Sequence, residues 1–190
     1  ELIELYNASD QAVDVTEWCL QRASATGMSY TAMTCIKASD AALSTRVMLP
    51  PYGYVVFASE LTATMNPTLQ YDLIFSAGMA DTGGRMRVVD AKGQVIDLIG
   101  WGNAGEHRGI APASAIPASQ PLRSLQRVVG DSGEYQDISD SSRDFIILPA
   151  KTSFESGALY ETIDLCINVP GIQEVVADHL LRNRSGECIE

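Results

Sequence analysis

The chain has 190 residues, of which 46% are hydrophobic and only 19% are charged. This length suits one domain with a small addition, and the composition supports a buried core and argues against global disorder. With 24 acidic and 13 basic residues the net charge is −11, so the chain lacks the basic character that phosphate contacts require. We therefore expect no nucleic-acid binding by the isolated chain.

The start of the sequence suggests either a piece cut out of a longer protein or a mature product. The chain opens directly in the β-like segment ELIELYN (residues 1–7), without an initiator Met or a signal peptide. No stretch approaches the roughly 18 consecutive apolar residues of a transmembrane helix. We therefore expect no transmembrane segment within the chain, and any signal peptide or membrane anchor would lie outside it.

Short β-like segments follow one another along the first half of the chain. ELIELYN alternates weakly, and VDVTEWCL (13–20) alternates until its period shifts by one near Thr16–Glu17, which predicts a β-bulge. Residues 22–46 are polar, have weak periodicity and look like an insert. Two further strands are predicted at residues 54–58 and 71–75, the first of them after a Pro-Pro-Tyr-Gly turn.

The clearest pattern is a hairpin, RMRVVDAKGQVIDLIGWGN (85–103). Alternation runs along both of its arms, at Met86, Val88, Val95, Asp97 and Ile99. The connector DAKG fits a type I turn with Gly93 in the left-handed conformation, where a Cβ would be strained. By the same alternation Arg85 and Arg87 share one face of the arm, and the simplest interpretation is an exposed face that they keep soluble.

The second half begins with a long stretch that has no periodicity. Residues 102–121 are rich in Gly, Ala, Pro and Ser, and so long a connection is usually functional or disordered. SLQRVV (124–129) predicts a strand, and a last strand is expected near Phe145. Frequent short strands with turn signals between them indicate an all-β sandwich over about residues 1–150.

The last forty residues look like a separate small appendage (151–190). Helical spacing occurs here after Pro170–Gly171, at Ile172, Val175, Val176, His179 and Leu180. The segment lies between Cys166 and Cys188, which would clip the appendage if they were bridged.

Four cysteines fall into two pairs, Cys19 with Cys35 and Cys166 with Cys188. Four cysteines allow three connectivities, and local pairing is the simplest. There is no CxxC, and neither histidine lies at zinc-ligand spacing, so a metal site is disfavoured. Free buried thiols remain the alternative to disulfides. Two bridges would place the protein outside the reducing cytosol, at an extracellular or cell-surface location.

Five segments, in this order, resemble the lamin tail domain family as found in bacterial secreted and surface proteins. They are IELYNASDQAVDVTEWCL, LPPYGYVVFAS, RMRVVDAKGQVIDLIGWG, SLQR and DISDSSRDF, and they span about Ile3 to Phe145. The resemblance implies an immunoglobulin-like β-sandwich and a non-enzymatic module, often attached to nucleases or displayed on cell surfaces. The family usually has one more strand before IELYN, so what fills that edge is an open question.

The candidate binding loop is GEHRG, with Glu106, His107 and Arg108. A catalytic His needs an orienting carboxylate and a nucleophile within reach, and Ser114 or Glu106 would have to supply them. A solvated loop or a contact surface is the simpler interpretation, because loops on rigid scaffolds commonly carry binding. We therefore assign no catalytic residue.

Two other patterns have structural explanations, and a third arises often by chance. The acidic run Asp131–Asp144 has oxygen ligands that calcium favours, but it lacks the EF-hand order, and Asx and ST turns explain it better. Trp18 and Trp101 are expected to cover the core rather than to bind sugar. Glycosylation triplets begin at Asn7 and Asn183. No GxGxxG or phosphate loop occurs, so no cofactor is expected.

The leading hypothesis is a non-enzymatic extracellular or cell-surface binding or adhesion module of a bacterial protein. Its ligand would be a protein or a cell-surface component, contacted by the loops 22–46, 60–70 or 102–121. The alternative is an accessory domain that positions a nuclease or nucleic acid. A hydrolase with an atypical site is the third hypothesis.

Overall fold

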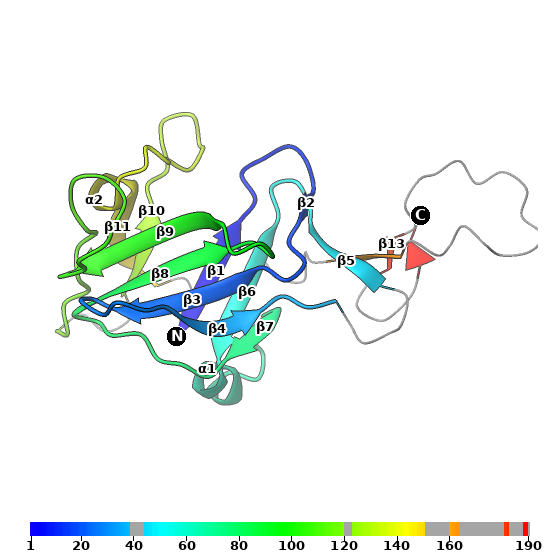
Figure 1. Cartoon of the computed structure of the whole chain (residues 1–190), viewed down its shortest axis with the longest axis horizontal. Helices are drawn as coiled ribbons and strands as arrows, with labels where there is room; N and C mark the ends of the chain where they lie inside the picture. Colours follow the sequence, from blue (N-terminus) through cyan, green and yellow to red (C-terminus); the bar gives the residue numbers. More distant parts are fainter. Residues whose placement is uncertain (39–43, 120–122, 151–159, 164–180, 183–187, 190) are drawn as a thin grey trace, which may run out of the picture.

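The protein is described here from a computed structural model. It covers residues 1–38, 44–119, 123–150, 160–163, 181–182 and 188–189. Almost all of its regular structure is β-strand, arranged in several sheets with two short helices. The predicted all-β class is confirmed (Figure 1).

One layer of the sandwich is a four-stranded antiparallel sheet, called here the front sheet. Its strands lie in the order β4-β3-β8-β9. They are β4 (Thr31–Cys35), β3 (Cys19–Ser24), β8 (Gly83–Val89) and β9 (Val95–Gly102). The predicted hairpin forms its β8–β9 half, and Gly93 in the connecting turn has φ of 79°. The N–H of Gly93 donates to the carbonyl of Asp90 at 2.9 Å, so the turn closes as predicted.

The opposite layer contains a three-stranded sheet and a hairpin. In the sheet, β1 (Leu2–Tyr6) pairs antiparallel with β6 (Tyr54–Ser59), which pairs in parallel with β7 (Leu73–Phe75). The hairpin joins β10 (Arg123–Arg127) to β11 (Phe145–Pro149). Helix α1 (Glu60–Met65) follows β6 directly, and helix α2 (Ser141–Asp144) leads into β11.

A further sheet contains both N-terminal and C-terminal strands. Its order is β14-β13-β12-β5-β2, with β2 at Val13–Asp14, β5 at Ser44–Leu49, β12 at Tyr160–Ile163, β13 at Leu181–Arg182 and β14 at Cys188–Ile189. Figure 1 shows β5 and β13 extending away from the two layers of the sandwich. Strand β5 is thus bonded on one side to β2 and on the other to β12.

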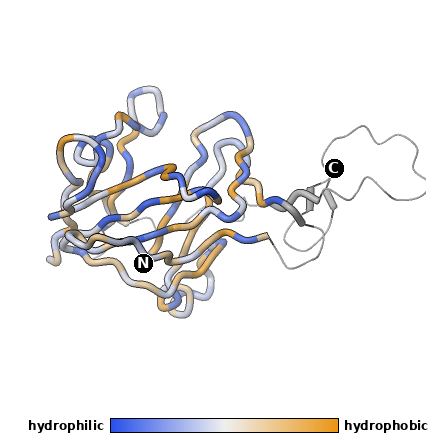
Figure 2. The backbone as a smooth tube through the Cα atoms, in the orientation of Figure 1, coloured by the Kyte–Doolittle hydropathy of each residue, from blue (hydrophilic) through white to orange (hydrophobic). Residues whose placement is uncertain are grey.

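The core lies between the two layers. Its buried side chains are Val15, Leu20, Ile36, Val47, Leu49, Val55, Phe57, Phe75, Met86, Val88, Trp101 and Ala113. Figure 2 shows hydrophobic stretches along the strands and frequent hydrophilic colour in the connecting loops. Val88 is buried as predicted, and Ile99 and Phe145 are partly buried against this cluster. Trp101 is buried and Trp18 packs on the core, which confirms that both cover it.

The predicted β-bulge near Thr16–Glu17 is wrong, because the chain changes sheets there. The N–H of Val15 donates to the carbonyl of Val47 in β5, whereas the N–H of Glu17 donates to the carbonyl of Ile36, next to β4. Glu17 has φ of 60°, in the left-handed region. A strand that crosses from one sheet to another reverses which face is inward, and this explains the shift in period.

The polar segment 22–46 is more regular than its sequence suggests. It contains the end of β3, all of β4 and the start of β5. Thr31 and Ala32 of β4 are exposed. An edge strand with an exposed end needs no continuous apolar alternation, so periodicity gave no signal for it.

Candidate binding surface at the loop end

Three connections meet at one end of the front sheet. Ser24 of β3 pairs with Gly84 of β8, and Gly84 pairs with Trp101 of β9, so these strands start or finish together. The connections are residues 25–30 between β3 and β4, residues 76–82 before β8, and residues 103–113 after β9. We call this group the loop end; Figure 1 shows it at the left of the front sheet.

The connection after β9 is fixed to the sheet by its backbone. The N–H of Gly102 donates to the carbonyl of Ala113, and the N–H of Ala113 donates to the carbonyl of Gly100, each at 2.8 Å. Ala113 is fully buried. A Cβ placed on Gly100 would lie 2.3 Å from the carbonyl oxygen of Glu106, so the loop folds closely back over the sheet. This part of the long stretch 102–121 therefore has a defined structure.

Arg85 joins the loop after β9 to the β3–β4 loop. Its side chain is 7% exposed, and its Nη1 lies 2.7 Å from Oε2 of Glu106. Its Nε donates to the carbonyl of Ser24 at 3.2 Å, and its Nη2 donates to the carbonyl of Gly27. The N–H of Gly105 also donates to the carbonyl of Ala25 at 2.8 Å. Arg85 thus holds two loops together with all three of its nitrogens.

Tyr30 covers both arginines of β8. The guanidinium carbon of Arg87 lies 3.8 Å from the centre of the Tyr30 ring, and that of Arg85 lies 5.0 Å away. Such stacking of a cation on an aromatic face is attractive. The hydroxyl of Tyr30 donates to Glu106 at 3.0 Å. Burial, together with this bond and the negative charge of Glu106, raises the pKa of Tyr30 to about 12.

The interpretation of Arg85 and Arg87 as residues of an exposed face is therefore wrong. Arg85 is buried and Arg87 is half-buried, with its Nε donating to Gln21 at 2.8 Å. Alternation places them correctly on the face opposite Met86 and Val88. Alternation alone does not reveal that Glu106, 21 residues from Arg85, and the loop containing Gly27, 58 residues from it, fold over that face, because this depends on tertiary contacts.

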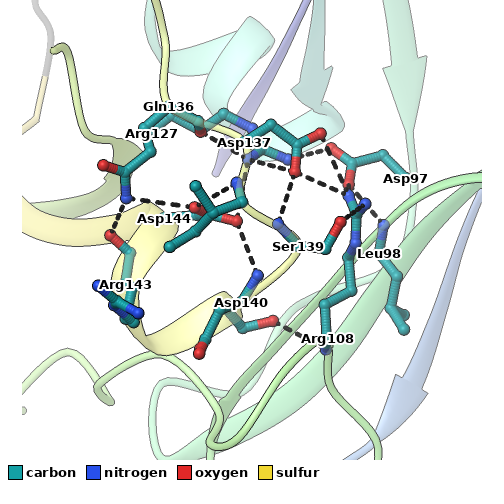
Figure 3. Close-up of polar contacts among 12 residues, drawn as sticks. Asp97, Leu98, Arg108, Arg127, Gln136, Asp137, Ser139, Asp140, Arg143 and Asp144 are labelled. Atoms are coloured by element: carbon teal, nitrogen blue, oxygen red, sulfur yellow. Dashed lines mark hydrogen bonds and ion pairs between the residues drawn. The ribbon is translucent and has the colours of Figure 1, made fainter.

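A second charged cluster lies beside α2 (Figure 3). Asp97 of β9 accepts from Arg108 at 2.8 Å and from Arg127 of β10 at 2.6 Å. Arg108 also contacts Asp137 at 3.3 Å. Arg127 lies 4.6 Å from the centre of the Phe145 ring. These pairs tie the edge of the front sheet to the β10–β11 hairpin and to the loop after β9.

The acidic segment next to this cluster makes turns, as predicted. Asp140 caps α2 by accepting from the N–H of Ser142, and its pKa is lowered chiefly by the hydroxyl of Ser142, 2.7 Å away. The buried carboxylate of Asp144 accepts from the N–H groups of Ile138 and Asp140. Burial alone would raise the pKa of Asp144, but these bonds, with Gln136 and Arg127, outweigh burial and lower it.

The candidate residues Glu106, His107 and Arg108 have different surroundings. Glu106 and Arg108 are held in the two charged clusters just described. His107 is half-buried, and its Nδ1 lies 3.4 Å from the carbonyl oxygen of Arg108. Within the part of the chain that the structure describes, no group of three or more His, Cys, Asp or Glu side chains is placed to hold a metal ion. Sequence reasoning missed Tyr30, a single aromatic residue in a polar segment.

A shallow groove of about 320 Å³ opens beside these loops, at the end of the core. Its polar lining comes from Arg22, Ser24, Ser29 and Thr31. Met79, Ala80, Gly83, Gly84, Trp101 and Ala23 complete it. Next to it, Met28 is 99% exposed. The loop end therefore offers polar and apolar groups on a rigid frame.

The remaining sequence features can now be placed. Asn7 is buried and its amide donates to the carbonyls of Gln11, Leu49 and Pro50, so the folded protein does not present it for glycosylation. Cys19 and Cys35 form the predicted disulfide. Cys166, Asn183 and the predicted helical segment 172–180 lie outside the described residues. No described helix is both long and apolar enough to cross a bilayer.

The two facing layers and the core between them define an immunoglobulin-like β-sandwich. The family model of the Lamin Tail Domain matches residues 1–103, more than half of the chain. The chain belongs to this family, whose members are immunoglobulin-like and in general not catalytic. No curated protein matches the chain.

Proposed function

We propose that this chain is a non-enzymatic, extracellular or cell-surface binding or adhesion module of a bacterial protein. The observation that carries the proposal is the loop end, where Arg85, Glu106 and Tyr30 hold the connection after β9 to the β3–β4 loop, and Trp101 donates to the carbonyl of Ala80 in the connection before β8. Preorganised loops lose less conformational entropy on binding than free ones. Exposed Met28 and the groove beside it supply the contact area.

The location outside the cytosol is supported by the chemistry of the cysteines. Disulfides persist in oxidising compartments and are rare in reducing ones. Cys19 and Cys35 are bridged. We propose the same for Cys166 with Cys188, which would clip the appendage at residues 151–190 onto a domain of residues 1–150. A mass spectrum of unreduced peptides checks both bridges.

The alternative, an accessory domain for a nuclease or nucleic acid, has less support. Three basic residues, Arg85, Arg87 and Lys92, come closest to forming a basic cluster in the sequence. Arg85 is buried and paired with Glu106, and Arg87 lies under Tyr30. Phosphate contacts need accessible cations, so this face gives little attraction for a nucleic acid.

A binding experiment with one matched pair of variants tests the proposal. Surface proteins and glycans from host and neighbouring cells are passed over the immobilised chain, and each captured component is purified and titrated directly. Met28→Ser should weaken that binding, because it removes an exposed apolar side chain at the loop end. Met65→Ser makes the same change on α1, where Met65 is 70% exposed, and should leave affinity unchanged. Equal effects of the two variants would contradict a role for the loop end.

A further inference from the structure

The Cys19–Cys35 disulfide ties β4 to β3 at the end of these two strands that is opposite to the loop end. Cys19 is the first residue of β3, Cys35 is the last residue of β4, and the two are directly opposite in the ladder. Both are half-buried on the face that also carries Arg85 and Arg87. A small dithiol can therefore approach the bridge while the protein stays folded.

Strand β4 lies at the edge of the front sheet, and next to the bridge it is followed by buried Ile36, whose N–H donates to the carbonyl of Trp18 and whose carbonyl accepts from the N–H of Glu17. Among the described strands it pairs with β3 alone, and the register of that pairing shifts between Leu20 and Gln21. Thr31 and Ala32, at its far end, are exposed. An edge strand with an interrupted ladder has low local stability, so the covalent tie matters more here than it would in a central strand.

Strand β4 directly follows Tyr30, the residue whose ring covers Arg85 and Arg87. Tyr30 immediately precedes Thr31, the first residue of β4. Its ring stacks on Arg87 and Arg85, and its hydroxyl donates to Glu106. When β4 loosens, Tyr30 loses the support that keeps it on the sheet, and Glu106 loses one of its two partners.

We propose that the Cys19–Cys35 bridge is a redox switch that sets the order of the loop end. A dithiol reductant opens it, which loosens β4 and lifts Tyr30 from Arg85 and Arg87; an oxidant of the thiol–disulfide class restores it. This regulation rests on the binding function proposed above for the same surface.

The chemistry is thiol–disulfide exchange. A thiolate of the dithiol attacks one cysteine sulfur, the S–S bond breaks, and the other sulfur leaves as a thiolate that takes up a proton. The second thiol of the reductant then displaces the bound cysteine from the mixed disulfide. Two electrons and two protons pass to the protein, and the dithiol becomes a disulfide. Because the ladder keeps the two cysteines opposite each other, the reverse reaction needs no refolding.

Hydrogen exchange tests the switch without any ligand. The full chain carries Cys166→Ser and Cys188→Ser, so that dithiothreitol acts on the Cys19–Cys35 pair alone. On reduction, amides in residues 28–35 should exchange about tenfold faster or more, amides of β6 should be unchanged, and reoxidation should restore the first value. Unchanged exchange in residues 28–35 would overturn the proposal. Equal loss of protection in β6 would also overturn it, because the bridge would then support the whole fold.

Chemical labelling of arginine gives a second, independent test. Cys19→Ser with Cys35→Ser imitates the reduced pair, and phenylglyoxal reports which guanidinium groups are accessible. Arg85 and Arg87 should be labelled several-fold faster in this variant, whereas Arg46, whose side chain is already 55% exposed, should be labelled at the same rate. Equal rates for Arg85 would contradict the movement of Tyr30. Because neither test uses a ligand, a failed binding function and a failed switch give different results.

Discussion

Arg85 is a buried charged residue, and each of its three side-chain nitrogens donates to an acceptor inside the protein. Its three side-chain nitrogens bond to Glu106 and to the carbonyls of Ser24 and Gly27. The planar guanidinium of Arg has three nitrogens that can donate to acceptors in different directions, whereas the ammonium of Lys donates from one compact nitrogen. Sequence alone does not distinguish such a buried arginine from a solvent-exposed one, because both occur at the polar positions of a strand that alternates polar and apolar residues.

The first prediction concerns this residue. Arg85→Lys should lower the free energy of unfolding by about 2 kcal/mol, since carbonyls and a carboxylate lose their donors in a buried place. Arg46→Lys makes the same exchange at an exposed side chain, 3.8 Å from Asp14, and should change stability by less than about 0.5 kcal/mol. Urea unfolding of both variants measures the difference. Equal losses would show that the bonds of Arg85 add no stability.

Gly100 is a second residue whose identity is dictated by the loop above it. Gly100→Ala should destabilise the protein by about 1–3 kcal/mol, because its Cβ would lie 2.3 Å from a backbone oxygen that has to move. Gly105→Ala, in the same loop, meets its nearest atom at 3.5 Å and should be tolerated. Thermal unfolding of the two variants checks this. A neutral Gly100→Ala would mean that residues 104–107 do not press on the sheet.

The carboxylates of Asp140 and Asp144 make stability depend on pH. Both have pKa values below the ordinary 3.8 in the folded protein. Their contribution is therefore complete above that value and is lost as the pH falls through the folded pKa values. We expect the free energy of unfolding to fall on acidification below about pH 5. Asp144→Asn should be less stable at pH 7 and should show a smaller loss between pH 6 and pH 3, measured by denaturant unfolding. A slope equal to that of the parent would contradict this assignment.

At the scale of elements, the β8–β9 hairpin shows a turn specified by one residue. Gly93 has φ of 79°, and a Cβ there would meet no atom within 4 Å. Only the backbone conformation opposes substitution. Gly93→Ala should therefore cost about 1 kcal/mol, and Gly93→Asn should cost less, because Asn tolerates the left-handed region. Chemical unfolding curves would show this order, and an Ala variant as stable as the parent would contradict it.

Elements with strong local signals were predictable, and elements defined by tertiary contacts were not. The hairpin, β1, β6 and the entry to β11 at Phe145 follow from alternation and turn residues. The sheet change at Thr16–Trp18 produces a shift in the period of the sequence, but a β-bulge produces the same shift, so the sequence alone does not separate the two. Tyr30 and the partners of Glu106 carry no local pattern, since their positions depend on loops that meet only after folding.

For the whole molecule, the charge balance predicts no useful affinity for duplex DNA. The net charge of the chain is −11. Arg85 and Arg87, two of the three residues that come closest to forming a basic cluster, lie under the ring of Tyr30. A gel-shift titration at about 50 mM salt is the sensitive measurement, because low salt exaggerates electrostatic binding. Micromolar binding that weakens steeply with added salt, and that is lost on Arg87→Ala, would favour the nucleic-acid accessory role instead. Lys92→Ala, at the hairpin turn, is the control. An equal loss of DNA binding in this variant would show a general effect of lost positive charge rather than a contact made by Arg87.

The pairing of β12 with β5 determines where the polypeptide can be shortened. The ladder runs from Tyr160–Met48 to Ile163–Ser44, so residues near the C-terminus cover one side of a strand near the N-terminus. A truncation after residue 150 would leave the N–H and C=O groups on that side of β5 without these partners, and an uncovered strand invites pairing between molecules. A shortened chain should therefore self-associate in light scattering where the longer one does not, and a protease cut between residues 150 and 160 should leave the two fragments held together.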